Sequence, residues 1–163
     1  MKQTHRIYLL IALLSGATMI TAQTQIAGKT CIGKWKTIDD DSGRAKSIIE
    51  ITKSGNRYYG QVIELLDPKN LEDSGVDTFE EIMCDDCPED RGQGEPVIGL
   101  QLIWDMELDD DKWAEGKIMD PDGGKIYDCT MWLDEDDPSG NTLKVRGWLA
   151  FLFRTQTWYR VED

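Results

Sequence analysis

The chain has 163 residues and carries 31 aspartates and glutamates against 18 lysines and arginines, a formal net charge of −13 at pH 7. A surface of this charge repels phosphate backbones and anionic membranes, which argues against a nucleic-acid-binding protein. The only histidine is His5. The rest of the chain therefore lacks the imidazole that Ser-His-Asp catalysis, Cys-His catalysis and histidine-containing zinc sites need.

The N-terminus has the pattern of an export signal. Lys2, His5 and Arg6 precede an apolar run at residues 7–14, which is shorter than the roughly 20 residues of a membrane-spanning helix. Small residues follow as far as Ala22. We therefore expect a signal peptide over residues 1–22, export to the periplasm or the cell exterior, and no transmembrane segment after the signal is removed.

Beyond a flexible N-terminus expected over residues 23–30, eight segments alternate apolar and polar side chains and are separated by turn residues. The clearest is residues 97–108, in which six apolar side chains from Ile98 to Leu108 recur with a period of two. We predict strands at residues 31–38, 47–53, 57–66, 97–108, 113–119, 125–133, 143–149 and 151–161.

Eight short strands joined mostly by tight turns are typical of an all-β antiparallel barrel or a strongly curved sandwich. We predict the barrel, as a single domain over residues 31–163. With eight strands, the interior is just wide enough for packed side chains or for one small ligand.

Residues 67–96 lack strand periodicity. A connection of this length is often functional, and we expect it to form a lid at one end of the barrel. Within it, residues 76–83 are predicted to form one or two helical turns, with Asp77 as a weak cap.

The two ends of the predicted barrel domain carry a Gly-x-Trp and a Trp-x-Arg. In small closed barrels, such residues plug one end, because a guanidinium can stack on an indole face. We therefore assign Trp35 and Arg160 to a structural barrel plug.

Motifs spread along the chain resemble one protein family. They include Gly33-Lys34-Trp35, Cys84-x-x-Cys87, Gly116-Lys117-Ile118 and the closing Arg154-Thr155-Gln156-Thr157-Trp158-x-Arg160-Val161. The chain resembles domain of unknown function 2147, an uncharacterised family of exported bacterial proteins. The resemblance implies an exported β-rich domain without an established activity. More distantly, the two ends are similar to those of lipocalin- and avidin-like barrels (calycin type), which implies ligand binding by analogy.

Cys84 and Cys87 are separated by two residues, Asp85 and Asp86. In an oxidising compartment a local disulfide is the simplest outcome. The surrounding carboxylates oppose the thiolate of a redox pair, and a zinc site would need two further ligands; free thiols are the remaining alternative.

The two other cysteines, Cys31 and Cys129, are not in a paired spacing. They either form a second disulfide with each other or remain buried free thiols, and the sequence does not choose between these outcomes.

The acidic runs at residues 39–41, 109–111 and 134–137 lie where hairpins reverse. None has the alternating ligands of a calcium loop, so we interpret them as solvated turns. We predict no metal site, no cofactor and no catalytic residues.

Large aromatic side chains exceed what a minimal core requires, and those predicted to bind a ligand are Tyr59, Trp104, Trp113 and Trp132. We predict a non-enzymatic binding module for a small, partly apolar ligand that enters opposite Trp35. The alternative is a protein-interaction or inhibitor module, with a filled barrel and an acidic loop that docks a basic protein.

Overall fold

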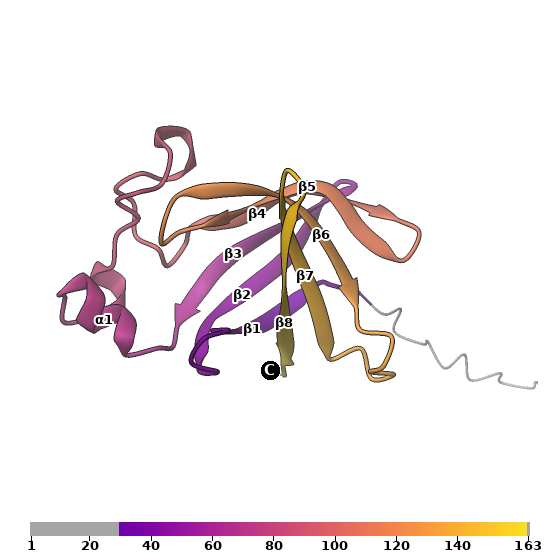
Figure 1. Ribbon diagram of the computed structural model, residues 1–163, viewed down its shortest axis with the longest axis horizontal. Helices are drawn as coiled ribbons and strands as arrows, with labels where there is room; N and C mark the ends of the chain where they lie inside the picture. The colour runs from indigo at the N-terminus through magenta and orange to yellow at the C-terminus, as the bar shows by residue number, and fades with distance from the viewer. Residues whose placement is uncertain (1–29, 163) are drawn as a thin grey trace, which may run out of the picture.

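The computed structural model describes residues 30–162. The expected signal peptide and nearly all of the expected flexible N-terminus lie outside the described residues. Eight strands form one closed antiparallel barrel in which each strand pairs with the next (Figure 1). They are β1 (Gly33–Ile38), β2 (Ala45–Ser54), β3 (Arg57–Leu65), β4 (Gln101–Asp109), β5 (Lys112–Asp120), β6 (Lys125–Leu133), β7 (Thr142–Leu149) and β8 (Leu152–Val161).

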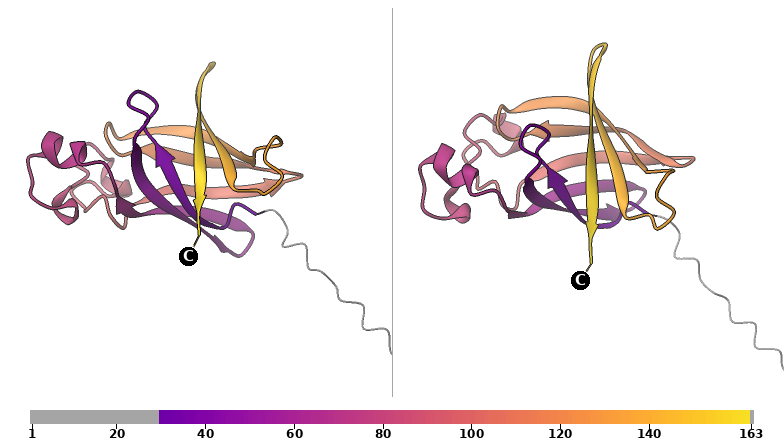
Figure 2. Two further views of the ribbon diagram at one scale, coloured as in Figure 1. Left: turned by 90° about the horizontal axis from the view of Figure 1, so that it is seen from below. Right: turned by 60° about the horizontal axis from the view of Figure 1, so that its bottom comes forward.

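The barrel closes where β1 pairs with β8. Only three residue pairs form this seam: Lys34 with Val161, Trp35 with Arg160, and Lys36 with Tyr159, after which the two strands no longer pair. By contrast, β7 and β8 pair over eight positions, from Thr142 with Tyr159 to Leu149 with Leu152. Beyond the seam, β8 diverges from β1 and continues into a hairpin that projects from the barrel (Figure 2). The predicted eight-stranded barrel is thus confirmed.

The fourth strand differs most from its predicted form. It begins at Gln101 rather than residue 97, because Gly99 (φ 100°) bends the chain and donates its amide to the Val62 carbonyl at 2.8 Å. Asp105 has φ 57°, which interrupts the alternation. As a result, Ile103 and Met106, three positions apart, are both completely buried. An irregular residue of this kind bends a strand and shifts which side chains face inward.

The segment between β3 and β4 contains one short helix, α1 (Lys69–Ser74), and two 3₁₀ turns, η1 (Phe79–Glu81) and η2 (Glu89–Arg91). The predicted helical turn near residues 76–83 therefore reduces to η1. Its N-cap is Thr78 rather than the predicted Asp77. The Glu81 carboxylate accepts hydrogen bonds from the amides of Asp77 and Thr78 at 3.2 and 3.3 Å, as in a capping box.

The core fills one end of the barrel. Its interior is packed by large side chains with exposed fractions of 5% or less, which include Trp35, Ile51, Tyr58, Met106, Trp113 and Met131. They come from the beginning of β1, β3 and β5 and from the end of β2, β4 and β6, which in an antiparallel barrel lie together. We call this the closed end. Among residues 30–162, no helix is long and apolar enough to cross a membrane.

Candidate functional site

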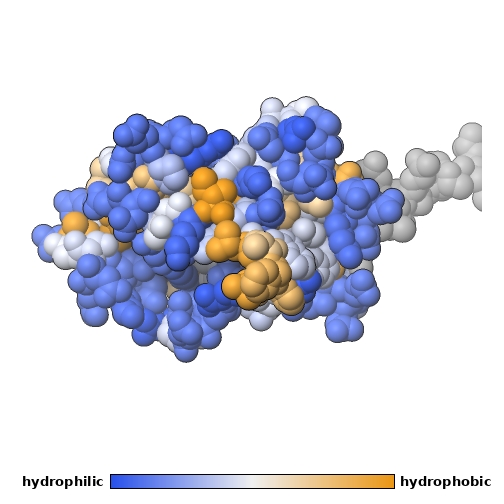
Figure 3. Space-filling view, turned by 45° about the horizontal axis from the view of Figure 1, so that its top comes forward, coloured by the Kyte–Doolittle hydropathy of each residue, from blue (hydrophilic) through white to orange (hydrophobic). Residues whose placement is uncertain are grey.

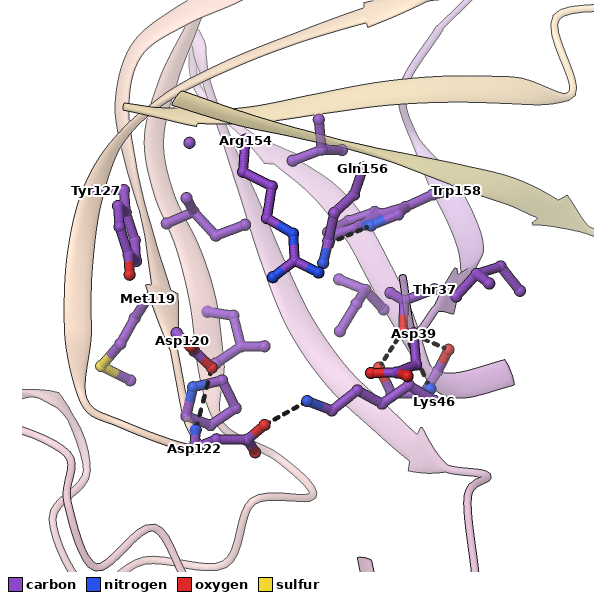
Figure 4. A pocket seen from close by; sticks show the side chains of 18 of the residues that line it. Thr37, Asp39, Lys46, Met119, Asp120, Asp122, Tyr127, Arg154, Gln156 and Trp158 are labelled. Carbon is purple, nitrogen blue, oxygen red and sulfur yellow. Dashed lines mark hydrogen bonds and ion pairs between the residues drawn. The ribbon is translucent and has the colours of Figure 1, made fainter. Parts of the chain in front are cut away.

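A pocket of about 570 Å³ opens at the opposite end of the barrel, where β1, β5 and β7 finish and β2, β6 and β8 begin (Figure 4). We call this the open end. The volume lies in the range of roughly 300–1,000 Å³ that is usual for small-molecule sites. The barrel is therefore filled by side chains in one half and hollow in the other.

The inner wall of the pocket is mainly apolar. It is made by Ile49 of β2, Ile118 of β5, Val145 of β7 and Trp158 of β8. The Trp158 indole is 3% exposed, and its Nε1 donates to Gln156 Oε1 at 3.1 Å. An indole whose polar atom is already paired presents its apolar ring to a ligand at little desolvation cost.

One side of the wall carries a pair of hydroxyl groups. Thr37 and Ser47 are opposite each other in β1 and β2, both are buried, and their hydroxyl oxygens lie 2.8 Å apart. The Thr37 hydroxyl also accepts the Ser47 amide at 3.1 Å. These two buried hydroxyl groups offer hydrogen-bonding positions beside the apolar wall.

Charged side chains surround the mouth, and most are held by partners. The Lys46 ammonium is paired with the Asp122 carboxylate. Burial acts to lower the pKa of Lys46, but the hydrogen bond to Asp122 and the charges of Asp122, Asp120 and Asp39 outweigh it, so its pKa is raised. Hydrogen bonds from the Ser42 side chain and backbone lower the pKa of Asp39.

Arg154 lines the pocket from β8 and is held by a residue outside it. Its Nε donates to Asp40 Oδ2 at 2.7 Å, and its Nη2 lies 2.6 Å from the same oxygen. Asp40 follows the end of β1. This ion pair therefore connects β8 to the β1–β2 turn beyond the point where the two strands stop pairing.

The predicted lid flanks the mouth rather than covering it. No residue between 67 and 96 lines the 570 Å³ pocket. The segment instead packs against the side of the barrel: the Arg91 guanidinium lies 4.2 Å from the centre of the Trp104 ring, and Cys84 Sγ lies 3.4 Å from the Pro121 carbonyl oxygen. Gly124 (φ 60°) lies so close to the Asp86 carbonyl that a Cβ at this position would collide with it.

A second, polar hollow of about 310 Å³ lies between the β1–β2 turn and α1. Arg44 crosses it to the buried Asp67, with Nη2 and Oδ2 3.0 Å apart. All the residues that line this hollow are polar or charged, so a ligand there would compete with ion pairs and with water.

None of the four aromatic residues predicted to bind a ligand lines the pocket. Trp104 is covered by Arg91, as described above. The Tyr59 hydroxyl donates to Asp105 Oδ1 at 3.3 Å, at the surface. These two side chains lie on β4 and β3, away from the mouth.

The other two predicted residues lie toward the closed end. Trp113 packs edge-on against Tyr58, with ring centres 5.9 Å apart. Its buried Nε1 is the one buried side-chain nitrogen or oxygen without a hydrogen-bond partner in the part of the chain that the structure describes. Trp132 carries the Arg146 guanidinium at 4.9 Å from its ring centre. A ligand role for the four stays a prediction.

The pocket residues that sequence reasoning missed are Tyr127, Gln156 and Trp158, with Arg154 at the mouth. Gln156 and Trp158 belong to the closing motif, of which only Arg160 was assigned to the plug. Their spacing of two carried a usable signal, because residues 154, 156 and 158 of one strand must share a face, and Arg160 on that face points to the barrel axis.

The predicted plug is present at the closed end. Trp35 is completely buried, and the Arg160 guanidinium lies 4.2 Å from its ring centre. Arg160 also donates to the carbonyls of Thr30 and Ile32 at 2.7 and 3.0 Å. Gly33 suits this position because its φ of 126° is rarely adopted by residues with a side chain, and a Cβ there would lie 3.0 Å from Arg160 Nη1.

Cys84 and Cys87 form a disulfide, as the sequence favoured, while Cys31 and Cys129 are buried free thiols, so the possible second disulfide is not formed. Burial raises the pKa of both free thiols to about 12. Among residues 30–162, no three His, Cys, Asp or Glu side chains are grouped so that they could hold a metal ion.

Comparisons with known proteins agree with this architecture. A family model described as "Uncharacterized protein conserved in bacteria (DUF2147)" matches residues 33–160. No protein of curated function matches the chain. A solved structure, described as protein HP1028 from the human pathogen Helicobacter pylori and as belonging to the lipocalin family, superimposes with a TM-score of 0.63. The alignment has 16% identity and covers 82% of this chain and 84% of that chain, so the likeness is one of fold.

Proposed function

This chain belongs to the DUF2147 family of uncharacterised bacterial proteins, and we propose that it is a non-enzymatic binding module for a small, partly apolar ligand. The observation that carries the proposal is the hollow open end of the barrel, with about 570 Å³ of space beside an apolar wall. The ligand's apolar part lies against Ile118, Val145 and Trp158, and its polar part reaches Thr37 and Ser47.

The electrostatics of the mouth support binding rather than catalysis. General acid–base catalysis near neutral pH needs a group whose pKa is moved toward 7. The two shifts at the mouth act the other way: the pKa of Lys46 is raised and that of Asp39 is lowered. Both groups are thereby held in their ordinary charged forms.

The proposal is tested by thermal-shift screening of the purified protein against lipids, haem-like cofactors and sugars, and by titration with the neutral fluorescent probe N-phenyl-1-naphthylamine. Ile118→Trp places an indole in the pocket, while Lys117→Trp places one on the neighbouring exposed position, where only a surface ion pair with Asp128 is lost. We expect Ile118→Trp to weaken probe binding at least tenfold and Lys117→Trp to leave it unchanged. Equal probe binding by both variants, with no stabilising compound in the screen, would overturn the proposal.

A second candidate function rests on the charge of residues 67–96, which contain eleven acids and two bases. In this second candidate function, residues 67–96 bind a basic protein, and the pocket does not bind a ligand. Co-purification of one protein that is released by salt would favour it, because exposed charge pairs are screened. A small molecule retained from the producing cells would favour the pocket.

We further propose that the protein acts outside the cytoplasm. The support is the signal-like pattern of residues 1–22 and the disulfide between Cys84 and Cys87, a bond that persists in oxidising compartments. N-terminal sequencing of the protein recovered from the periplasm or the medium should begin at Gln23. Recovery of the unprocessed chain from the cytoplasm alone would contradict this.

A further inference from the structure

The hairpin between β7 and β8 has an exposed apolar tip. Leu149, Phe151, Leu152 and Phe153 have exposed fractions of 52%, 87%, 63% and 58%. The hairpin projects from the barrel (Figure 2), and apolar side chains gather in a patch on the face shown in Figure 3. Four large apolar side chains exposed to solvent at the end of a projecting hairpin indicate a surface that binds a partner or a membrane.

The charge of the hairpin is opposite to that of the protein. From Thr142 to Val161 it contains four bases, Lys144, Arg146, Arg154 and Arg160, and no acid, whereas the whole chain has a net charge of −13. Arg146 and Arg154 are the bases nearest the tip, and Arg154 is paired with Asp40. The tip therefore combines an apolar end with the Arg146 cation behind it.

Aromatic rings lie between the apolar end and Arg146. Trp148 and Phe153 pack against each other at a tilt of 46°, with ring centres 4.9 Å apart, and the Arg146 guanidinium lies 5.3 and 4.6 Å from the two centres. An amphipathic indole beside a cation matches the level of lipid head groups in a bilayer.

The dimensions of the tip favour a bilayer over a second protein. Taking roughly 200 Å² for each large apolar side chain, the four expose on the order of 500 Å², less than the roughly 800 Å² that each partner of a stable interface buries. A projecting tip also finds few complementary surfaces on another copy of this chain, whereas a fluid bilayer takes any convex shape.

We propose that the β7–β8 tip inserts into the surface of a lipid bilayer. Phe151 and Leu152 lie among the acyl chains, Trp148 and Phe153 lie at the head-group level, and Arg146 faces the phosphates. The acidic body of the protein stays in the aqueous phase, so the membrane concerned is zwitterionic or weakly anionic, because a strongly anionic surface repels the rest of the molecule.

This docking deepens the proposed function, because three residues of the tip are also pocket residues. Leu149 and Leu152 pair across the hairpin, and both line the pocket together with Phe153. An apolar ligand could therefore pass from the bilayer along these side chains into the barrel. The transfer step rests on the proposed function, whereas the docking step does not.

Flotation with phosphatidylcholine vesicles tests the docking. Phe151→Asp is the informative variant because Phe151 is 87% exposed and does not line the pocket. Leu108→Asp is the matched control, since Leu108 is 52% exposed at the closed end of the barrel. We expect the unaltered protein and Leu108→Asp to float with the vesicles, and Phe151→Asp to lose at least tenfold in bound fraction.

Quenching by lipids brominated on their acyl chains reports the orientation. We expect vesicle-bound protein to lose tryptophan fluorescence, and Trp148→Phe to lose most of this quenching while still floating. Phe151→Asp should bind N-phenyl-1-naphthylamine in solution as the unaltered protein does, so a failure of docking is distinguished from a failure of the pocket.

Three results would overturn the proposal. The first is absence of flotation with phosphatidylcholine vesicles, and the second is an equal loss in Phe151→Asp and Leu108→Asp. The third is concentration-dependent dimerisation that Phe151→Asp abolishes in the absence of lipid, which would make the tip an interface between copies of the chain.

Discussion

Arg154 of β8 and Asp40 of the β1–β2 turn form an ion pair across a gap in the barrel wall, with Nη2 2.6 Å from Oδ2. The two strands pair only as far as Lys36 and Tyr159, so toward the mouth this contact takes the place of backbone hydrogen bonds. The mouth is therefore bounded on one side by a contact that can break without unfolding the barrel.

Asp40→Asn should accelerate ligand exchange with little effect on stability. The pair is partly exposed, with side-chain fractions of 62% and 36%, and exposed pairs contribute about 0–1 kcal/mol. We expect stopped-flow uptake and release of N-phenyl-1-naphthylamine to become severalfold faster at similar affinity. Lys117→Met, which removes the surface pair with Asp128 away from the gap, should leave both rates unchanged.

Truncation of the plug should be among the most damaging single changes. Trp35→Ala removes a completely buried indole, and we expect the free energy of unfolding to fall by about 3–5 kcal/mol. Trp35→Phe keeps most of the ring and loses the hydrogen bond from Nε1 to the Cys31 carbonyl (2.7 Å), a loss of about 1–3 kcal/mol. Probe binding by the folded Trp35→Phe variant should be normal, because the plug is at the end opposite the pocket; a large loss of affinity would place Trp35 in the site after all.

Trp113 and Trp158 should respond in opposite ways to the same substitution. The Trp113 Nε1 is buried without a partner, so Trp113→Phe removes an unsatisfied donor and should be neutral or slightly stabilising in chemical denaturation. Trp158→Phe removes the hydrogen bond to Gln156 and should cost about 1 kcal/mol. Equal destabilisation by both would show that Trp113 contributes through packing alone.

The thiols of Cys31 and Cys129 should be unreactive toward thiol reagents in the native protein. Desolvation raises their pKa to about 12, so at pH 8 neither forms the thiolate that reacts with Ellman's reagent. We expect no rapid reaction in the folded state, two thiols after unfolding, and four after unfolding with reduction. Four thiols without reduction would mean that Cys84 and Cys87 are not bonded.

Asp137 should make the protein sensitive to strong acid. Hydrogen bonds from the side chains of Ser139 and Thr142, and from the amides of Ser139 and Asn141, lower its pKa to about 2. Because the folded pKa lies below the unfolded value of about 3.9, this stabilisation is present above pH 4 and lost as the pH falls toward 2. The melting temperature of Asp137→Asn should lie below that of the unaltered protein at pH 5–7, and the two should converge near pH 2. A difference that persists at pH 2 would contradict this origin.

The strands were predictable because each is bounded by turn residues and alternates with a period of two. Lys125–Leu133 was predicted to the residue, and most of the other boundaries differ by one or two. The beginning of β4 was not, because Gly99 and Asp105 take positive φ values that depend on contacts with β3 and on the local bulge. Alternation alone does not report such contacts.

The pocket was harder to predict than the barrel. Sequence periodicity predicts that Trp104 and Trp158 are buried. It does not distinguish a side chain covered by a loop on the outside of the barrel from one that lies in the barrel interior. Arg91, 13 residues before Trp104 in the sequence, covers that indole. The alternation of apolar and polar residues around either position does not predict this contact. Trp158 lines the pocket and was given no role, because within the closing motif only Arg160 was assigned one, as the plug on Trp35.

Closure of the barrel has a consequence for behaviour at high concentration. Because β1 and β8 pair, every strand has a neighbour on both sides, but the part of β8 before Tyr159 pairs with β7 alone and is the edge on which a strand of another molecule could be added. The pairing between β1 and β8 is the shortest in the barrel, since three residue pairs hold it. If the protein forms fibrils or swapped dimers under destabilising conditions, the exchange should begin where these two strands separate.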